Sequence, residues 1–127
     1  MPTYRAAVEP GPGTVIGGHS FGGRVASLIA ADQAPAGLVL LSYPLHRPGH
    51  PETVDARIAH WPRIVCPVLL LSGESDPFAR IQLLREVVVR LPHAQLVTYP
   101  RLGHGLNAVR DGALDRIASW LRELPMG

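Results

Sequence analysis

TVIGGHSFGGRVASLIAAD, residues 14–32, decides how the rest of the sequence is interpreted. It opens with a short apolar run, and Val25, Leu28 and Ile29 then recur at helical spacing. Between these two patterns Ser20 stands in the arrangement glycine, any residue, serine, any residue, glycine. A serine on a sharp strand-to-helix turn is typical of a nucleophile whose hydroxyl is exposed above a sheet. The stretch therefore predicts a strand, a tight turn and a helix, with Ser20 at the turn.

Strand-like and helical patterns alternate along the rest of the chain. We expect further strands at 37–42, 67–72 and 94–99, and helices at 79–91 and 107–124. The last helix has a predicted apolar stripe formed by Leu114, Ile117, Ala118 and Leu121. Two of the runs, GLVLLS and PVLLLS, lack polar alternation, which is typical of strands covered on both faces. The order predicts an α/β fold, a parallel sheet of about four strands with flanking helices, in one domain over residues 1–127 whose core begins near residue 14.

Composition narrows the class of protein. The 127 residues are 46% hydrophobic and 17% charged, which is typical of a globular chain. The net charge is only +2, and the twelve basic residues, all arginine, are scattered, so we expect no nucleic-acid partner. Cys66 is the only cysteine, so no internal disulfide is predicted.

Hydrophobic segments are too short for a membrane role. No stretch approaches the eighteen or so apolar residues of a membrane span. The N-terminal residues also lack the apolar core of a signal peptide. We expect a soluble cytoplasmic protein with no membrane partner.

The segment 43–64, between the second and third predicted strands, is rich in proline and histidine. It offers only a short helix at about 53–60. In an open parallel sheet such a connection leaves the carboxyl end of a strand, beside the crevice where ligands bind. The segment is therefore predicted to be a lid or pocket wall. His46 and His50 are predicted to be exposed loop residues, and contact with a substrate is the alternative.

Two further side chains complete the chemistry that Ser20 needs. A serine hydroxyl is a weak nucleophile unless a base takes its proton, and the base needs an acid to orient it. Asp76 follows the third predicted strand in LLLSGESDPF, and His104 follows the fourth in TYPRLGHGLN. All three residues come after parallel strands, so they are predicted to meet at one edge of the sheet. Glu74 is the alternative acid.

These motifs together resemble the alpha/beta-hydrolase superfamily, from about Thr14 to the C-terminus. GGHSFGG is similar to its nucleophile elbow, GESDPF to its acid loop and GHGLN to its histidine loop. LLSYPLHRPG and CPVLLLSGESDPF are most similar to the small dienelactone-hydrolase-like group. The resemblance implies a catalytic triad of Ser20 as nucleophile, Asp76 as orienting acid and His104 as base, with the backbone N–H of Phe21 as one oxyanion donor.

The surroundings of the predicted site follow from the same motifs. Side chains at Gly18 and Gly22 are expected to collide with neighbouring elements, and His19 to pack beneath the nucleophile. The histidines are dispersed and Cys66 is expected in a strand, so we predict no metal site, and no cofactor is implied. An apolar acyl pocket is a hypothesis, and packing around the third strand is its equal alternative, for four residues: Tyr43, Leu45, Trp61 and Phe78.

One departure from the superfamily leaves three functions open. Its members have several strands before the nucleophile strand, and one of the loops among them supplies a second oxyanion N–H. Only thirteen residues precede Thr14 here. The chain is therefore predicted to be a serine hydrolase acting on a small-molecule ester or related acyl bond, a non-catalytic binding module, or a truncated hydrolase. The sheet edge at 14–18 is expected to bind a second copy or a partner chain.

Overall fold

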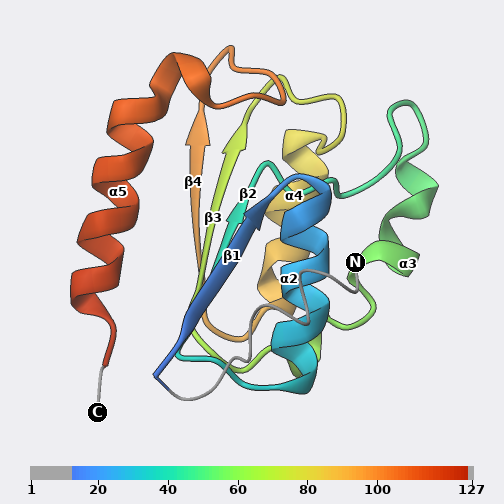
Figure 1. Cartoon of the computed structure of the whole chain (residues 1–127). Coiled ribbons are helices and arrows are strands. Elements are labelled where there is room, and N and C mark those ends of the chain that lie inside the picture. The colour runs from blue at the N-terminus through green and yellow to red at the C-terminus, as the bar shows by residue number, and fades with distance from the viewer. Residues whose placement is uncertain (1–12, 126–127) are drawn as a thin grey trace.

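The computed structural model describes residues 13–125, which fold around one parallel sheet (Figure 1). The strands stand in the sequence order β1-β2-β3-β4, and each neighbouring pair is parallel. Their bounds are Val15–His19 for β1, Gly37–Leu41 for β2, Val68–Gly73 for β3 and Ala94–Tyr99 for β4. The predicted α/β fold with a four-stranded parallel sheet is confirmed, and each strand begins or ends within one residue of its predicted range.

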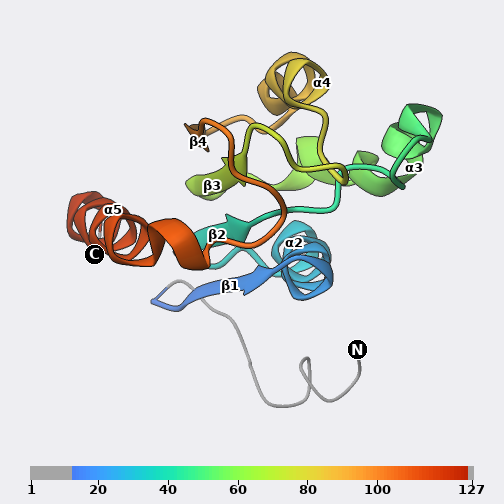
Figure 2. The ribbon, with the colours of Figure 1, turned by 90° about the horizontal axis from the view of Figure 1, so that it is seen from above.

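Helices cover both faces of the sheet. The described residues form α2 (Phe21–Asp32), α3 (Val54–Ile58), α4 (Ile81–Val87) and α5 (Arg110–Glu123). Figure 2 shows α5 on one face of the sheet, and α2 and α4 on the other. Within residues 13–125, no helix combines the length and the apolarity that crossing a bilayer requires.

Alternate residues of the two central strands belong to two separate cores. In β2, Leu38 and Leu40 pack in the core on the α2 side, whereas Val39 packs in the core on the α5 side. In β3, Leu70 and Leu71 divide in the same way. This arrangement explains why GLVLL and VLLLS lack polar alternation, because neither face of these strands reaches water.

The strand register brings the carboxyl ends of the strands to one edge. His19 pairs with Leu41 in the β1–β2 ladder, and Gly73 pairs with Tyr99 in the β3–β4 ladder. The segments that follow β1, β2, β3 and β4 therefore all leave the sheet at the edge that is uppermost in Figure 1.

The buried face of α5 differs from the predicted stripe. Leu114 and Leu121 are 56% and 39% exposed, whereas Ala113 and Trp120 are buried against the sheet together with Leu124. The reason is steric: the Trp120 ring lies over Gly37, so close that a Cβ atom there would stand 2.9 Å from the ring. The large indole of Trp120 sets the rotation of the helix. The predicted stripe did not include Trp120.

Segment 43–64 is a packed part of the molecule. It contains a 3₁₀ turn at Pro51–Thr53, the short helix α3, and a second 3₁₀ turn at Trp61–Arg63. Leu45, Ile58 and Trp61 have no exposed surface, and all three belong to the core that α2 and α4 cover. The prediction of a lid is therefore wrong, because a segment with several core side chains cannot lift off without exposing them. The alternative of a pocket wall agrees with the structure, since His46, Gly49 and Pro51 line a cavity of about 530 Å³ beside Asp76.

Two leucines of the C-terminal region test this packing. We expect Leu124→Ala to lower the free energy of unfolding by about 2 kcal/mol, since it removes a buried side chain and leaves a cavity. Leu114→Ala is expected to change it by about 0.5 kcal/mol or less, because that side chain is half exposed. Urea titrations of both variants measure the difference. A larger loss for Leu114→Ala would contradict the observed rotation of α5.

Candidate active site

Ser20 alone forms the turn between β1 and α2. Its backbone has φ 54° and ψ −123°, a conformation that L-residues rarely adopt. Two hydrogen bonds hold it there: the Ser20 N–H donates to Leu41 O at 2.7 Å, and the Arg24 N–H donates to Ser20 O at 3.1 Å. Although Ser20 stands at the N-cap of α2, its side chain does not cap the helix. The hydroxyl is instead directed to another partner.

The glycines around Ser20 differ in the space that they leave. A Cβ at Gly18 would collide with the backbone of Gly22 and Gly23, so the prediction for Gly18 is confirmed. The prediction for Gly22 is wrong, because a Cβ there would meet no atom within 4 Å. Two other glycines also lack space: a Cβ at Gly23 would lie 2.8 Å from Gly18 O, and a Cβ at Gly17 would lie 2.6 Å from Val39 O. Gly22 points to open space, and Gly23 faces the strand.

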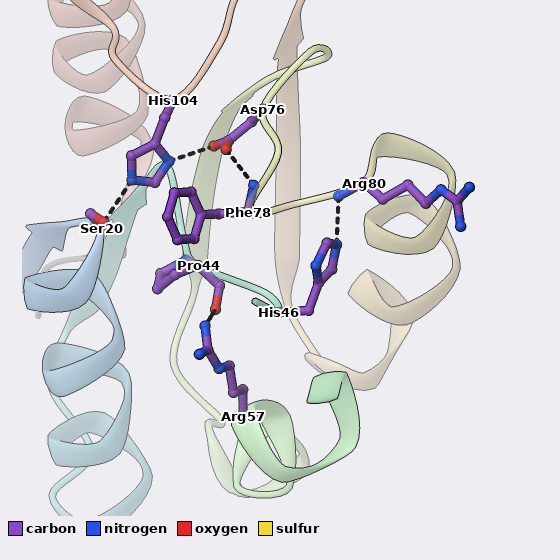
Figure 3. Close-up of polar contacts among 8 residues, drawn as sticks. All are labelled: Ser20, Pro44, His46, Arg57, Asp76, Phe78, Arg80 and His104. Carbon is purple, nitrogen blue, oxygen red and sulfur yellow. Dashed lines mark hydrogen bonds and ion pairs between the residues drawn. The ribbon is translucent and has the colours of Figure 1, made fainter. Parts of the chain in front are cut away.

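Three side chains from different segments form a continuous hydrogen-bonded chain (Figure 3). His104 Nε2 lies 2.7 Å from Ser20 Oγ, and His104 Nδ1 lies 2.8 Å from Asp76 Oδ2. An ionised carboxylate can only accept a hydrogen bond, so Nδ1 carries the ring hydrogen. Nε2 is then free to accept the hydroxyl hydrogen of Ser20. The structure thus brings together the three residues that the sequence selected.

The Asp76 carboxylate is shielded and fixed. Its side chain has no exposed surface, whereas 27% of the His104 side chain is exposed. The Phe78 N–H donates to Asp76 Oδ1 at 2.8 Å, which leaves Oδ2 for His104. The Phe78 ring also lies against the imidazole, with centroids 4.6 Å apart. Phe78 therefore contacts both the acid, through its N–H, and the base, through its ring.

Glu74, the alternative acid, faces other partners. It accepts a hydrogen bond from Thr98 Oγ1 at 2.8 Å and lies 3.4 Å from the Arg85 guanidinium. Its backbone N–H is bonded to Tyr99 O at 2.9 Å. Between the two carboxylates, it is Asp76 that the fold places beside the imidazole.

A glycine that sequence reasoning overlooked brings the acid loop and the histidine loop together. A Cβ at Gly73 would collide with the carbonyl oxygens of Leu102 and Gly103. Next to this contact, the Ser75 N–H donates to Leu102 O at 2.8 Å. The glycine in LLLSGESDPF was the available signal, because a glycine at a strand end often marks a close backbone approach.

Three of the four predicted pocket residues lie away from the site. Tyr43, Leu45 and Trp61 are buried in the core that α2 and α4 cover. The Tyr43 hydroxyl donates to Arg57 O at 2.7 Å, and its ring meets Trp61 edge-on at 5.2 Å. The polar tip of Tyr43 is thereby satisfied inside the protein. Phe78 is the member of the set that the structure brings to His104.

A cavity of about 310 Å³ lies beside the hydrogen-bonded chain. His19 is on its wall and exposed, with its ring 5.7 Å from that of His104, so the expectation that it packs beneath Ser20 is wrong. Apolar side chains supply most of the lining, and the strand end, the histidine loop and α5 contribute the remaining wall residues: Leu41, Gly105, Leu106, Asn107, Arg110, Ala113, Leu114 and Ile117.

The other buried histidines have structural partners. His60 Nε2 lies 2.7 Å from Ser27 Oγ, and burial, helped by Arg63 and Arg24, lowers the pKa of His60 to about 4. His60 is therefore neutral near pH 7. His46, expected to be exposed, is only 3% exposed, whereas His50 is exposed as expected. In the part of the chain that the structure describes, no three His, Cys, Asp or Glu side chains are grouped as metal ligands.

The sequence and this geometry agree with one family of proteins. A sequence model described as the alpha/beta hydrolase domain matches residues 3–116. The chain belongs to the alpha/beta hydrolase family.

Solved structures with the same fold are longer chains than this alpha/beta hydrolase chain. A protein named as a predicted CIB-like hydrolase from Thermoplasma acidophilum has a TM-score of 0.70 and 21% identity, and the match covers 87% of this chain and 51% of that one. An esterase from Pyrococcus furiosus has a TM-score of 0.70 and 17% identity, covering 89% and 54%. A variant of SOBER1 from Arabidopsis thaliana has a TM-score of 0.65 and 21% identity, covering 95% and 58%. The chain thus spans about half the length of these structures.

Two adjacent glycines provide a test of the turn. Gly23→Ala should lower the free energy of unfolding by about 1–3 kcal/mol, because the new methyl group overlaps the Gly18 carbonyl of β1. Gly22→Ala should change it by about 0.5 kcal/mol or less, since the methyl group enters open space. Urea unfolding of the two variants separates these outcomes. Equal losses would show that the space around α2 is not as described.

Proposed function

We propose that this alpha/beta hydrolase chain carries the catalytic residues of a serine hydrolase acting on an ester or related acyl bond of a small molecule. The observation that carries the proposal is the unbroken hydrogen-bonded chain Ser20–His104–Asp76. In this proposal His104 takes the hydroxyl proton as Ser20 attacks the acyl carbon, and later gives it to the leaving group. The shielded Asp76 carboxylate keeps the hydrogen on Nδ1 and stabilises the imidazolium that forms.

The position of Ser20 supports an oxyanion role for the neighbouring backbone. Phe21 is the first residue of α2, so its N–H has no acceptor within the helix. We propose that it donates to the oxygen that becomes negatively charged during attack. The apolar walls of the cavity beside His104 support a small apolar acyl group as the bound part of the substrate.

A second function is favoured by the length of the chain. The three structures with the same fold are nearly twice as long as the region they share with it. The resemblance implies that the second oxyanion N–H comes from a loop before β1, and loss of one such donor typically lowers kcat about 10²- to 10³-fold. The alternatives are therefore a non-catalytic hydrolase-like module, or the triad-bearing portion of a longer hydrolase.

Several finer expectations stay predictions. They are membership of the dienelactone-hydrolase-like group, a cytoplasmic location, and association with a second copy or a partner chain at the β1 edge. They are compatible with any of the three functions above.

The nucleophile can be tested without knowing the substrate. A fluorophosphonate probe reacts with an activated serine, so it should label the wild-type chain, and Ser20→Ala should abolish the labelling without loss of fold. Gel fluorescence and intact-protein mass spectrometry measure the modification, and circular dichroism checks the fold. Ser27→Ala is a matched control, since Ser27 is buried against His60. Equal labelling of wild type and Ser20→Ala would exclude Ser20 as the nucleophile.

The two carboxylates can be separated by charge-neutral substitutions. Asp76→Asn should lower the labelling rate about 10²-fold or more, because the amide no longer fixes the ring hydrogen on Nδ1 or stabilises the imidazolium. Glu74→Gln should change the rate about two-fold or less, since Glu74 faces Thr98. Labelling time courses at constant probe concentration give both rates. A larger loss for Glu74→Gln would mean that the acid is wrongly assigned.

A further inference from the structure

His46 ties together two segments that leave neighbouring strands. It lies in segment 43–50, which follows β2, and it faces the acid loop 74–80, which follows β3. The His46 N–H donates to Phe78 O at 3.0 Å. The Arg80 N–H donates to His46 Nε2 at 3.0 Å, as Figure 3 shows. One residue thus contacts the acid loop through both its backbone and its side chain.

The contact of His46 Nδ1 shows which ring nitrogen accepts the hydrogen bond from the Arg80 N–H. His46 Nδ1 lies 2.8 Å from Arg47 O, and a carbonyl oxygen can only accept, so Nδ1 carries the hydrogen. Nε2 is then the acceptor that the Arg80 N–H requires. With both nitrogens engaged and only 3% of its surface exposed, His46 has no group left for a substrate. Its role must be exerted on the protein itself.

The acid loop is anchored differently on its two sides. Before Asp76, the Glu74 N–H is bonded to Tyr99 O and the Ser75 N–H to Leu102 O, so this side is fixed to β4 and the turn after it. After Asp76, the hydrogen bonds that join residues 77–80 to segment 43–50 within the described chain both involve His46. Of these two bonds, only the one from the Arg80 N–H depends on the imidazole, because the His46 N–H is a backbone group that every residue except proline keeps.

We infer that His46 is a positioning residue that holds the Asp76 carboxylate in line with His104. Within this loop, the Phe78 carbonyl accepts the backbone N–H of residue 46, a bond that does not depend on the imidazole, and the Phe78 N–H donates to Asp76 Oδ1. Arg80, held through Nε2, fixes the far end of the same short loop. The catalytic consequence rests on the proposed function, whereas the orientation of Asp76 toward His104 does not.

Two amide substitutions divide the contacts of the imidazole. In His46→Gln the amide oxygen reaches the position of Nε2, so it can accept the Arg80 N–H. In His46→Asn the shorter amide reaches only the position of Nδ1, so it keeps the contact with Arg47 O and loses the one with Arg80. We expect His46→Asn to slow fluorophosphonate labelling of Ser20 about ten-fold, and His46→Gln to stay within about three-fold of wild type, because small misplacements of catalytic groups are costly. Equal rates for both variants would overturn the inference.

A double substitution shows whether the effect passes through Asp76. If His46 acts by positioning that carboxylate, adding His46→Asn to Asp76→Asn should slow labelling less than about two-fold further. A residue that merely stabilises the fold would slow labelling about ten-fold in both backgrounds. That second result would overturn the inference.

An NMR measurement on the full chain is independent of catalysis. The His104 Nδ1–H proton, hydrogen-bonded to the shielded Asp76 carboxylate, should give a low-field resonance in the wild type. The resonance should persist in His46→Gln and be broadened or lost in His46→Asn. If the wild type is not labelled by the probe, the proposed function fails, and this resonance alone decides the positioning role. Its persistence in His46→Asn would overturn that role.

Variants of the donor residue, Arg80, test the same hydrogen bond in case the His46→Asn protein does not fold. Arg80 is exposed and has φ −54°, which proline can adopt, so Arg80→Pro removes the N–H donor and leaves His46 intact. Arg80→Ala is the matched control, since it keeps the N–H and removes the guanidinium. We expect Arg80→Pro to weaken the His104 resonance and slow labelling about ten-fold, and Arg80→Ala to match wild type in both. No difference between the two would count against the inference.

Discussion

The close approach of β1 to the first turn of α2 is the constraint on which the site depends. Gly18 and Gly23 touch backbone to backbone, so that neither position has space for a side chain. This contact forces the chain to reverse within one residue. Ser20 therefore takes a positive φ that costs on the order of 1–3 kcal/mol, and the surrounding hydrogen bonds and core must offset that strain. The result is a hydroxyl that stands clear of the helix it begins.

Parallel pairing supplies the remaining geometry. Because β1, β2, β3 and β4 run in the same direction, the loops after them emerge together, and residues 56 and 84 positions from Ser20 in the sequence become its near neighbours. The acid loop and the histidine loop can approach because Gly73 has no side chain to separate them. The site is thus formed by the segments at the strand ends, and the close approaches that it needs occur at Gly18, Gly23 and Gly73.

Segment 43–64 illustrates how composition alone can mislead. Its prolines and histidines are typical of an exposed loop, yet Leu45, Ile58 and Trp61 are fully buried. These apolar side chains anchor the segment to the α2 face of the sheet, and the anchored backbone then presents His46 to the acid loop. A polar contact between two loops is thereby fixed by hydrophobic packing beneath them. Exposed His50, only four residues later, faces solvent beside Glu52.

The sequence by itself determined the strands, their parallel direction and the three residues that meet at the sheet edge. It could do so because continuous apolar runs, helical spacing and glycine-flanked polar residues are local signals that the fold obeys. Only the tertiary structure decided that Gly23 rather than Gly22 faces β1, that α5 buries Trp120 rather than Leu114 and Leu121, and that His46 is buried with both ring nitrogens bonded. These outcomes depend on which neighbour lies opposite each side chain, and on how large it is. That information is absent from local spacing, since it arises when distant segments pack against one another.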